Sequence, residues 1–129
     1  MSKATTRLER YLQDELGECE NTDLDRRLEE LEALSESLPE EAMDDDLTVL
    51  SALSDGTRYT IIRLLVEADE ELCVCELDSL IDVSTSAISH ALSQLHDAGL
   101  VEREKDGKWR KYRATGRATA LLVALDGTR

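Results

Sequence analysis

The chain has 129 residues, of which 41% are hydrophobic and 34% charged, and its formal net charge is −14. This length and hydrophobic content suffice for one modest core, so we expect a single folded unit with an appended arm. The N-terminus lacks a basic-then-apolar signal pattern, and no apolar run approaches the roughly 18 residues of a membrane span, which predicts a soluble, cytoplasmic protein. Three cysteines, an odd number, argue against a disulfide framework and leave metal binding, redox chemistry or plain burial open.

The charge is distributed unevenly along the chain. Residues 1–46 hold 16 acids and 5 bases, a net of −11, whereas residues 47–129 hold 13 acids and 10 bases, a net of −3. Within the second part, residues 103–117 carry seven bases and two acids, a net of +5. A basic patch on an acidic protein predicts a directed contact with an anion, although a solvated hairpin that happens to be basic is the alternative. The many acids, with arginine favoured over lysine, are also typical of a high-salt, halophilic cytoplasm.

Two amphipathic helices are predicted first. Apolar residues recur at helical spacing in residues 5–16, and a second leucine stripe occupies residues 24–38. Pro39 ends the second helix, and the acidic run at residues 40–46 is expected to be an exposed link. We therefore predict that residues 1–46 form an acidic helical N-terminal arm, whose leucine stripe packs on the protein's own core, on a dimer mate or on a partner helix.

A helix-turn-helix is predicted next. The pattern indicates a short helix at 47–53, an apolar helix at 59–66, a short helix at 75–81 and, after Ser84 as N-cap, a helix at 85–98. One face of that last helix is apolar, and the other carries short polar side chains. This is the layout of a helix-turn-helix, whose second helix, the recognition helix, enters the major groove. An ordinary surface helix is the alternative.

A β-hairpin is predicted directly after the recognition helix. Residues 101–114 form two strand-like runs joined at Asp106-Gly107, a strong two-residue turn pattern. The basic patch falls on this hairpin, the wing, which can lie along phosphates while the helix contacts base edges. The predicted fold is mainly α with a small β-hairpin, a dimeric winged helix-turn-helix. Its DNA-binding domain spans 47–115, and 116–129 form a C-terminal dimerisation helix.

Candidate DNA contacts follow from this layout. The residues assigned to the groove are Thr85, Ser86, Ser89, His90 and Gln94. The residues assigned to phosphates are Lys105, Lys108, Arg110 and Lys111. Two symmetric copies favour an inverted-repeat operator in double-stranded DNA, with half-sites about 34–36 Å apart or a multiple of that.

Several spaced motifs make the chain resemble a known family. SDGTR at 54–58, ELCVCEL at 71–77, STSAISHAL at 84–92, DAGLV at 97–101 and GKWRKYR at 107–113 follow the order seen in ArsR/SmtB-type metal(loid)-responsive repressors. The resemblance covers about residues 47–115, and ELCVCEL resembles the arsenic- and antimony-responsive branch as well as the cadmium and lead sensors. It implies a homodimeric winged-helix repressor that leaves operator DNA when a toxic metal or metalloid binds.

The pair Cys73 and Cys75 carries the predicted ligand chemistry. Soft thiolates favour As(III), Sb(III), Cd(II), Pb(II) or copper(I) as an inducer ligand, and no other cofactor is expected. In a regular helix these residues would lie about 200° apart, so their sulfurs converge only if the segment is extended or a helix starts between them. In the arsenic-responsive branch the resemblance implies a third cysteine where this chain has Asp78. The resemblance to cadmium sensors implies that Cys19, in the arm, completes the metal site; otherwise a solute thiol or water does.

Other functions stay open on the sequence alone. A vicinal-thiol redox regulator would use the pair without metal, a metal-sequestering protein would hold metal without an operator, and a ligand-independent DNA-binding regulator would need neither. The two cysteines could also be buried small hydrophobic residues. An enzyme is not expected, because there is no phosphate-cradling glycine loop and no nucleophile with an evident base.

Overall fold

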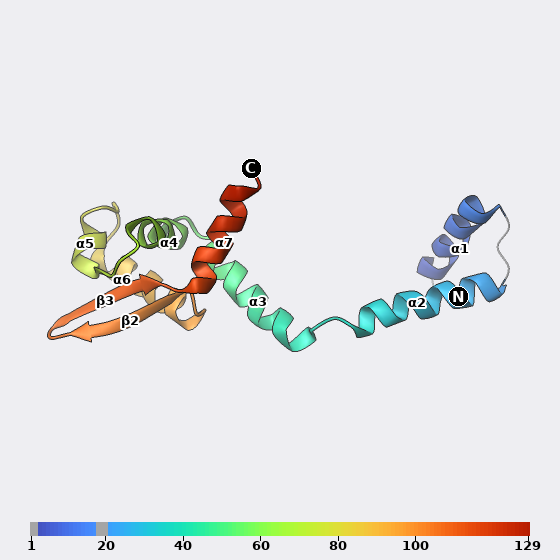
Figure 1. Ribbon diagram of the computed structural model, residues 1–129, viewed down its shortest axis with the longest axis horizontal. Helices are drawn as coiled ribbons and strands as arrows, with labels where there is room; N and C mark the ends of the chain where they lie inside the picture. The colour runs from blue at the N-terminus through green and yellow to red at the C-terminus, as the bar shows by residue number, and fades with distance from the viewer. Residues whose placement is uncertain (1–2, 18–20) are drawn as a thin grey trace. The chain divides into compact units, whose positions relative to one another are not determined.

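The computed structural model describes residues 3–17 and 21–129, and it divides into two compact units, Met1–Glu40 and Glu41–Arg129. In the described residues the elements are, in chain order (Figure 1), α1 (Lys3–Leu16), α2 (Asn21–Glu36), α3 (Glu40–Leu53), α4 (Gly56–Ala68), β1 (Leu72–Cys73), α5 (Val74–Asp78), α6 (Thr85–Asp97), β2 (Val101–Asp106), β3 (Trp109–Ala114) and α7 (Gly116–Gly127).

The first unit is a pair of helices, α1 and α2, as the two amphipathic patterns predicted. The helices contact one another, and Leu12 and Leu24 are their buried leucines. α2 ends three residues before Pro39, which cannot continue a helix. Leu34 and Leu38, the later members of the leucine stripe, are exposed.

The prediction that residues 40–46 form a link between two parts of the chain was wrong. The acidic run forms the first turns of α3, which continues unbroken to Leu53. Acidic side chains near a helix N-terminus interact favourably with the helix dipole, and Pro39 directly before the first helical residue suits a helix start. The run is exposed, as expected, and Asp45 pairs with Arg117 of α7 at 3.0 Å. The predicted arm boundary at residue 46 therefore falls inside a helix.

The core of the second unit lies between α4, α6, the sheet and α7. Its fully buried side chains are Ile61, Ile62, Leu65, Leu77, Ile88, Leu92, Leu95, Leu100 and Leu122. Three of these lie on the face of α6 that the helical periodicity predicted to be apolar. The recognition helix is thus held by its inner face, which leaves its polar face to solvent.

The wing is an antiparallel hairpin of β2 and β3. Val101 pairs with Ala114 and Asp106 with Trp109, so the connecting loop consists of Gly107 and Lys108. Gly107 has a φ of 63°, a left-handed conformation that glycine supplies at the first central position of a tight hairpin turn. The hairpin prediction is confirmed, and its two-residue loop starts one position later than Asp106-Gly107.

A third strand, β1, was not predicted. It joins the sheet in the order β1-β3-β2, with Leu72 opposite Tyr112 and Cys73 opposite Lys111. β1 has only two residues, too few for an alternating pattern, and its partner is far along the chain. The pairing places the first cysteine of the C-x-C pair directly beside the wing.

Replacing Leu92 with alanine should lower the free energy of unfolding by about 2–5 kcal/mol, because the truncation leaves a cavity in the core. Leu92 is fully buried in the described structure. The matched control is Ser93→Ala, an exposed neighbour on the same helix, which should change the free energy by no more than about 0.5 kcal/mol. Urea unfolding followed by circular dichroism measures both, and equal stability of the two variants would contradict the packing of α6.

Candidate DNA-binding surface and thiol site

The two cysteines of the C-x-C pair meet at the junction of β1 and α5. Cys73 is the N-cap of α5, with extended backbone angles of φ −85° and ψ 164°, and Cys75 lies in the first turn of the helix. The helix therefore starts between the two residues, which is one of the two arrangements that their spacing requires. Their Cα atoms are 5.4 Å apart, and their sulfurs are joined as a disulfide.

The two cysteines differ in exposure. Cys73 is buried, with 7% of its surface exposed, whereas Cys75 is exposed to solvent. The Cys73 backbone N–H donates to Glu76 Oε1 at 3.0 Å, which satisfies a free amide at the helix start. The exposure of Cys75 argues against the alternative that both cysteines are buried small hydrophobic residues. Cys73 is thus held beside the core, and Cys75 faces solvent.

The thiol segment lies between the recognition helix and the wing. A surface pocket of about 360 Å³ adjoins the pair, and it is lined by Cys73, Val74, Cys75, Asp78, Thr85, Lys108, Trp109 and Arg110. Thr85 Oγ1, at the start of α6, donates to Asp78 Oδ1, at the end of α5, at 2.9 Å. Strand pairing ties Cys73 to β3 of the wing. The thiol segment therefore contacts both elements that were predicted to contact DNA.

The predicted third ligand, Cys19, lies outside the described residues. Within residues 3–17 and 21–129, no three or more histidine, cysteine, aspartate and glutamate side chains lie close enough to hold a metal ion. Cys73 and Cys75, in their dithiol form, fit a soft ion as two of its ligands, because thiolates prefer such ions and the two sulfurs converge.

The predicted groove residues all lie on the exposed face of α6. Ser84 caps the helix as predicted, and its Oγ accepts from the Ala87 N–H at 3.1 Å. Thr85, Ser86, Ser89, His90 and Gln94 are all exposed. Two of them already have partners, since Thr85 bonds to Asp78 and Gln94 Oε1 accepts from Arg58 Nη1 at 2.9 Å.

The basic residues of the wing are divided between its two faces. Paired residues of an antiparallel hairpin share a face, and side chains alternate along each strand, so Lys105 and Arg110 lie on one face and Lys111 on the other. Lys111 pairs with Asp106 at 3.2 Å, and this hydrogen bond is the main cause that raises the pKa of Lys111 above its usual value. Lys111 therefore stays protonated, and the negative charge of Asp106 compensates part of its positive charge. In the described part of the chain, Lys105 and Arg110 have no acidic partner, and Lys108 lies over the Trp109 ring at 5.1 Å.

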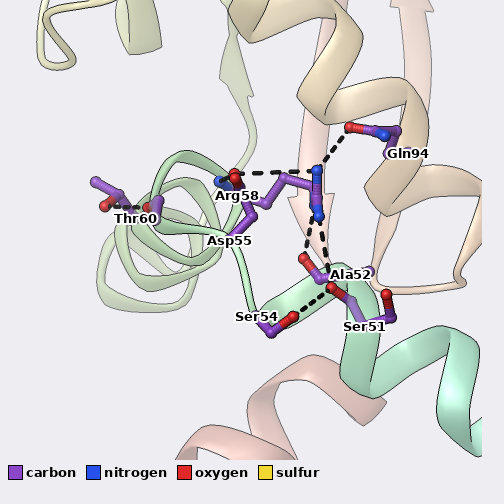
Figure 2. Close-up of polar contacts among 8 residues, drawn as sticks. Ser51, Ala52, Ser54, Asp55, Arg58, Thr60 and Gln94 are labelled. Atoms are coloured by element: carbon purple, nitrogen blue, oxygen red, sulfur yellow. Dashed lines mark hydrogen bonds and ion pairs between the residues drawn. The ribbon is translucent and has the colours of Figure 1, made fainter.

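Sequence reasoning missed the role of Arg58, although it noted the segment SDGTR. Arg58, in the first turn of α4, donates through Nε to the Ala52 carbonyl at 2.7 Å and through Nη1 to Gln94, as Figure 2 shows. Gln94 lies 36 positions away, so no local periodicity could have indicated this bond.

An apolar surface remains open beside α7. A pocket of about 440 Å³ lies between α3, α4 and α7 and is lined by Leu50, Leu53, Ser54, Tyr59, Leu121, Ala124, Leu125 and Thr128. Leu50 is 55% exposed and Leu125 48% exposed. Apolar patches of this kind mark interaction surfaces in many proteins.

These features together define a winged helix-turn-helix DNA-binding protein: a recognition helix held by its apolar face, a basic wing beside it and a three-stranded sheet joining them. Residues 49–103 match the family model described as "Bacterial regulatory protein, arsR family". The chain is 59% identical over 126 residues, or 98% of both chains, to the "Putative arsenical resistance operon repressor ArsR" of Halobacterium salinarum. The chain belongs to the arsR family of regulatory proteins, which confirms the resemblance seen in its motifs.

Two further relatives agree with this family. The "Cadmium resistance transcriptional regulatory protein CadC" of Listeria innocua is 46% identical over 56 residues, 43% of this chain and 46% of that protein. The structure of HlyU from Vibrio cholerae matches with a TM-score of 0.61 and 29% identity, over 68% of this chain and 95% of that chain. The winged-helix fold prediction is thereby confirmed, and a Halobacterium relative agrees with the halophilic composition. Among the described residues, no helix is both long and apolar enough to cross a membrane.

Proposed function

We propose that the chain is a transcriptional repressor, without enzymatic activity, that leaves its operator when arsenite or antimonite binds Cys73 and Cys75. The observation that carries this proposal is the convergence of the two sulfurs at the junction of β1 and α5, between the recognition helix and the wing. The name of the Halobacterium salinarum relative, an arsenical resistance operon repressor, supports the choice of ligand. The protein would act in the cytoplasm, where its DNA is.

The link from ligand to DNA runs through two contacts of the thiol segment. A ligand held by both thiolates favours one arrangement of this segment, and Asp78 transmits the change to Thr85 at the start of α6. The pairing of Cys73 with Lys111 transmits it to the wing. The ligand weakens DNA binding only by its differential affinity for the free and DNA-bound arrangements, typically worth about 1–3 kcal/mol.

A third ligand completes the proposed site. Cys19 of the arm is the remaining thiol of the chain, and we propose that it binds the same ion, from the same or the partner subunit. Cadmium and lead are further candidate inducers, supported by the name of the Listeria innocua relative. Both are soft enough for thiolate ligands.

The proposed DNA complex has one recognition helix in each of two major grooves. Ser86, Ser89 and His90 are exposed on the outward face of α6, and with Thr85 they are proposed to contact base edges. The proposed phosphate contacts are Lys105, Lys108 and Arg110, with a smaller contribution from Lys111 because Asp106 pairs with it.

We further propose that the protein is a homodimer. The apolar surface of α3 and α7 would form the seam between the subunits, with residues 116–129 as the dimerisation segment and 47–115 as the DNA-binding domain. The exposed leucines of this surface support an interface, because burying them against a second copy removes apolar area from water.

Titration of the protein–DNA complex tests the proposed function. DNA from the chain's own upstream region is labelled, bound at high salt under reducing conditions and followed by fluorescence anisotropy. Arsenite and antimonite should release the DNA at concentrations at least about tenfold below zinc, because As(III) and Sb(III) are the softer ions. Cadmium and copper are titrated in parallel. If the DNA is bound and none of these ions releases it, the metal(loid) proposal is wrong and a DNA-binding regulator remains.

A redox-responsive regulator is the second candidate, and the Cys73–Cys75 disulfide is the observation that favours it. A disulfide has no thiolate to offer a metal, so the oxidised and metal-bound forms exclude one another. Operator release by a mild oxidant in metal-free buffer, reversed by a dithiol reductant, would support this candidate. Release by arsenite under reducing conditions, with no effect of oxidant, would exclude it.

A further inference from the structure

Arg58 joins three elements of the second unit. Its Nε donates to the Ala52 carbonyl at 2.7 Å and its Nη2 to the Ser51 carbonyl at 3.4 Å, both in the last turn of α3. Its Nη1 donates to Gln94 Oε1 of the recognition helix at 2.9 Å. Figure 2 shows the guanidinium lying between the end of α3 and α6, with Gln94 pointing toward it.

The chemistry of these contacts suits arginine. The last carbonyls of a helix have no intrahelical partner, and a cation near them interacts favourably with the helix dipole. The planar guanidinium can donate to α3 through one edge and to α6 through another, which an ammonium on a flexible stem cannot reproduce. Asp55, the N-cap of α4, accepts from the Arg58 N–H at 3.0 Å and so holds the start of the side chain. With 19% of its side chain exposed, Arg58 is largely shielded from solvent.

We infer that Arg58 is a positioning residue that fastens the recognition helix to α3, and that Gln94 is its anchor on α6. The carbonyl group of the Gln94 side chain is occupied by Arg58, so this side chain orients the helix instead of contacting a base. This reassigns one of the five residues that the sequence placed in the groove.

The inference rests on the proposed homodimer. Leu50 and Leu53 of α3 line the apolar surface assigned to the dimer seam, and Ser51 and Ala52 lie between them in the chain. Arg58 therefore connects the recognition helix to the same helix that would contact the second subunit. It sets the angle and spacing of the two recognition helices in the dimer, which must match two grooves about 34–36 Å apart or a multiple of that.

This role has a specific consequence for DNA binding. A dimer that binds DNA with one half-site needs no fixed spacing between its two recognition helices. A dimer that binds two half-sites does, because the second helix reaches its groove only if the first is held at the right distance. Loss of the Arg58–Gln94 bond should therefore weaken binding to the complete operator and spare the single half-site.

The experiment compares complete and half-site DNA for Arg58→Gln, Gln94→Ala and the double variant, after footprinting has defined the half-sites. Each variant should lose about three- to tenfold in affinity for the complete operator, the size expected for one hydrogen bond, and less than about twofold for the half-site. In the double variant, Gln94→Ala should add no further loss, because its partner is already absent. Thr60→Ala is the control, because Thr60 is exposed on the same helix as Arg58 and its Oγ1 donates to the Gly56 carbonyl within that helix; this variant should bind both DNAs like the wild type.

Two results would overturn the inference. If Gln94→Ala weakens the half-site and the complete operator equally, and does so also beside Arg58→Gln, then Gln94 contacts a base. Gln94 is exposed, so replacing it with alanine cannot disrupt the core. If Gln94→Ala binds the complete operator like the wild type, the Gln94 side chain does not anchor the recognition helix. Gln94→Ala keeps the test valid if Arg58→Gln fails to fold. Light scattering on the wild type gives the oligomeric state independently. A monomer would refute both the homodimer and this inference, whereas a dimer with either result above would refute the inference alone.

Discussion

Replacing either Cys73 or Cys75 with serine should abolish release of the operator by arsenite, while the affinity for DNA without arsenite stays within about twofold of the wild type. A serine hydroxyl is a hard donor that stays protonated at neutral pH, so the site loses one of its two converging soft ligands. The concentration for half-release should rise about 100-fold or more, since two-point attachment becomes one-point attachment. Fluorescence anisotropy of labelled operator under reducing conditions measures both quantities.

Cys19→Ser is the matched variant, because it removes the remaining thiol of the chain and leaves the pair intact. A higher half-release concentration in this variant would identify Cys19 as the third ligand, whereas wild-type release would remove it from the site. Urea unfolding of Cys73→Ser is needed as well, since Cys73 is buried and serine could lower stability. Wild-type release by arsenite in both Cys73→Ser and Cys75→Ser would refute the metal(loid) site.

Replacing Lys105, Lys108 and Arg110 together with glutamine should flatten the dependence of DNA affinity on salt. Each phosphate contact contributes about 0.9 to the slope of log affinity against log salt, so three contacts in each of the two subunits of the proposed homodimer account for about 5. The affinity should fall by several orders of magnitude at low salt and by much less at high salt, where counterion release contributes little. Anisotropy titrations at four or more salt concentrations give the slope.

Lys111→Gln is the control for this experiment, because Lys111 is on the same strand as Arg110 but on the opposite face, paired with Asp106. It should change the slope less than any single replacement among the other three. An unchanged slope in the triple variant would show that the wing does not contact phosphates. If Lys111→Gln lowers the salt dependence of DNA affinity as much as a replacement of Lys105, Lys108 or Arg110, the division of charge between the two faces of the wing is contradicted.

Local sequence patterns were sufficient to predict most helices and the hairpin of the second unit. The spacing of Ile88, Leu92 and Leu95 predicted which face of α6 is buried, and Ser84 predicted where the helix starts. Asp106-Gly107 predicted the hairpin, since few residues other than glycine adopt a positive φ in so short a loop. These features depend on neighbours within a few residues, and for that reason a single sequence contains them. The family resemblance rested on the same local motifs.

The tertiary structure decided the contacts between segments distant in sequence. The spacing of Cys73 and Cys75 stated a condition for their sulfurs to converge, but the pairing of β1 with β3 ends the extended strand at Cys73 and lets α5 begin between them. The acidic run before Leu47 was predicted as a link, yet it continues as helix to the residues that bind Arg58. Arg58 and Gln94 are brought together by the packing of α4 against α6. Such pairings depend on how the elements close around one core, and periodicity within an element carries no information about its partner.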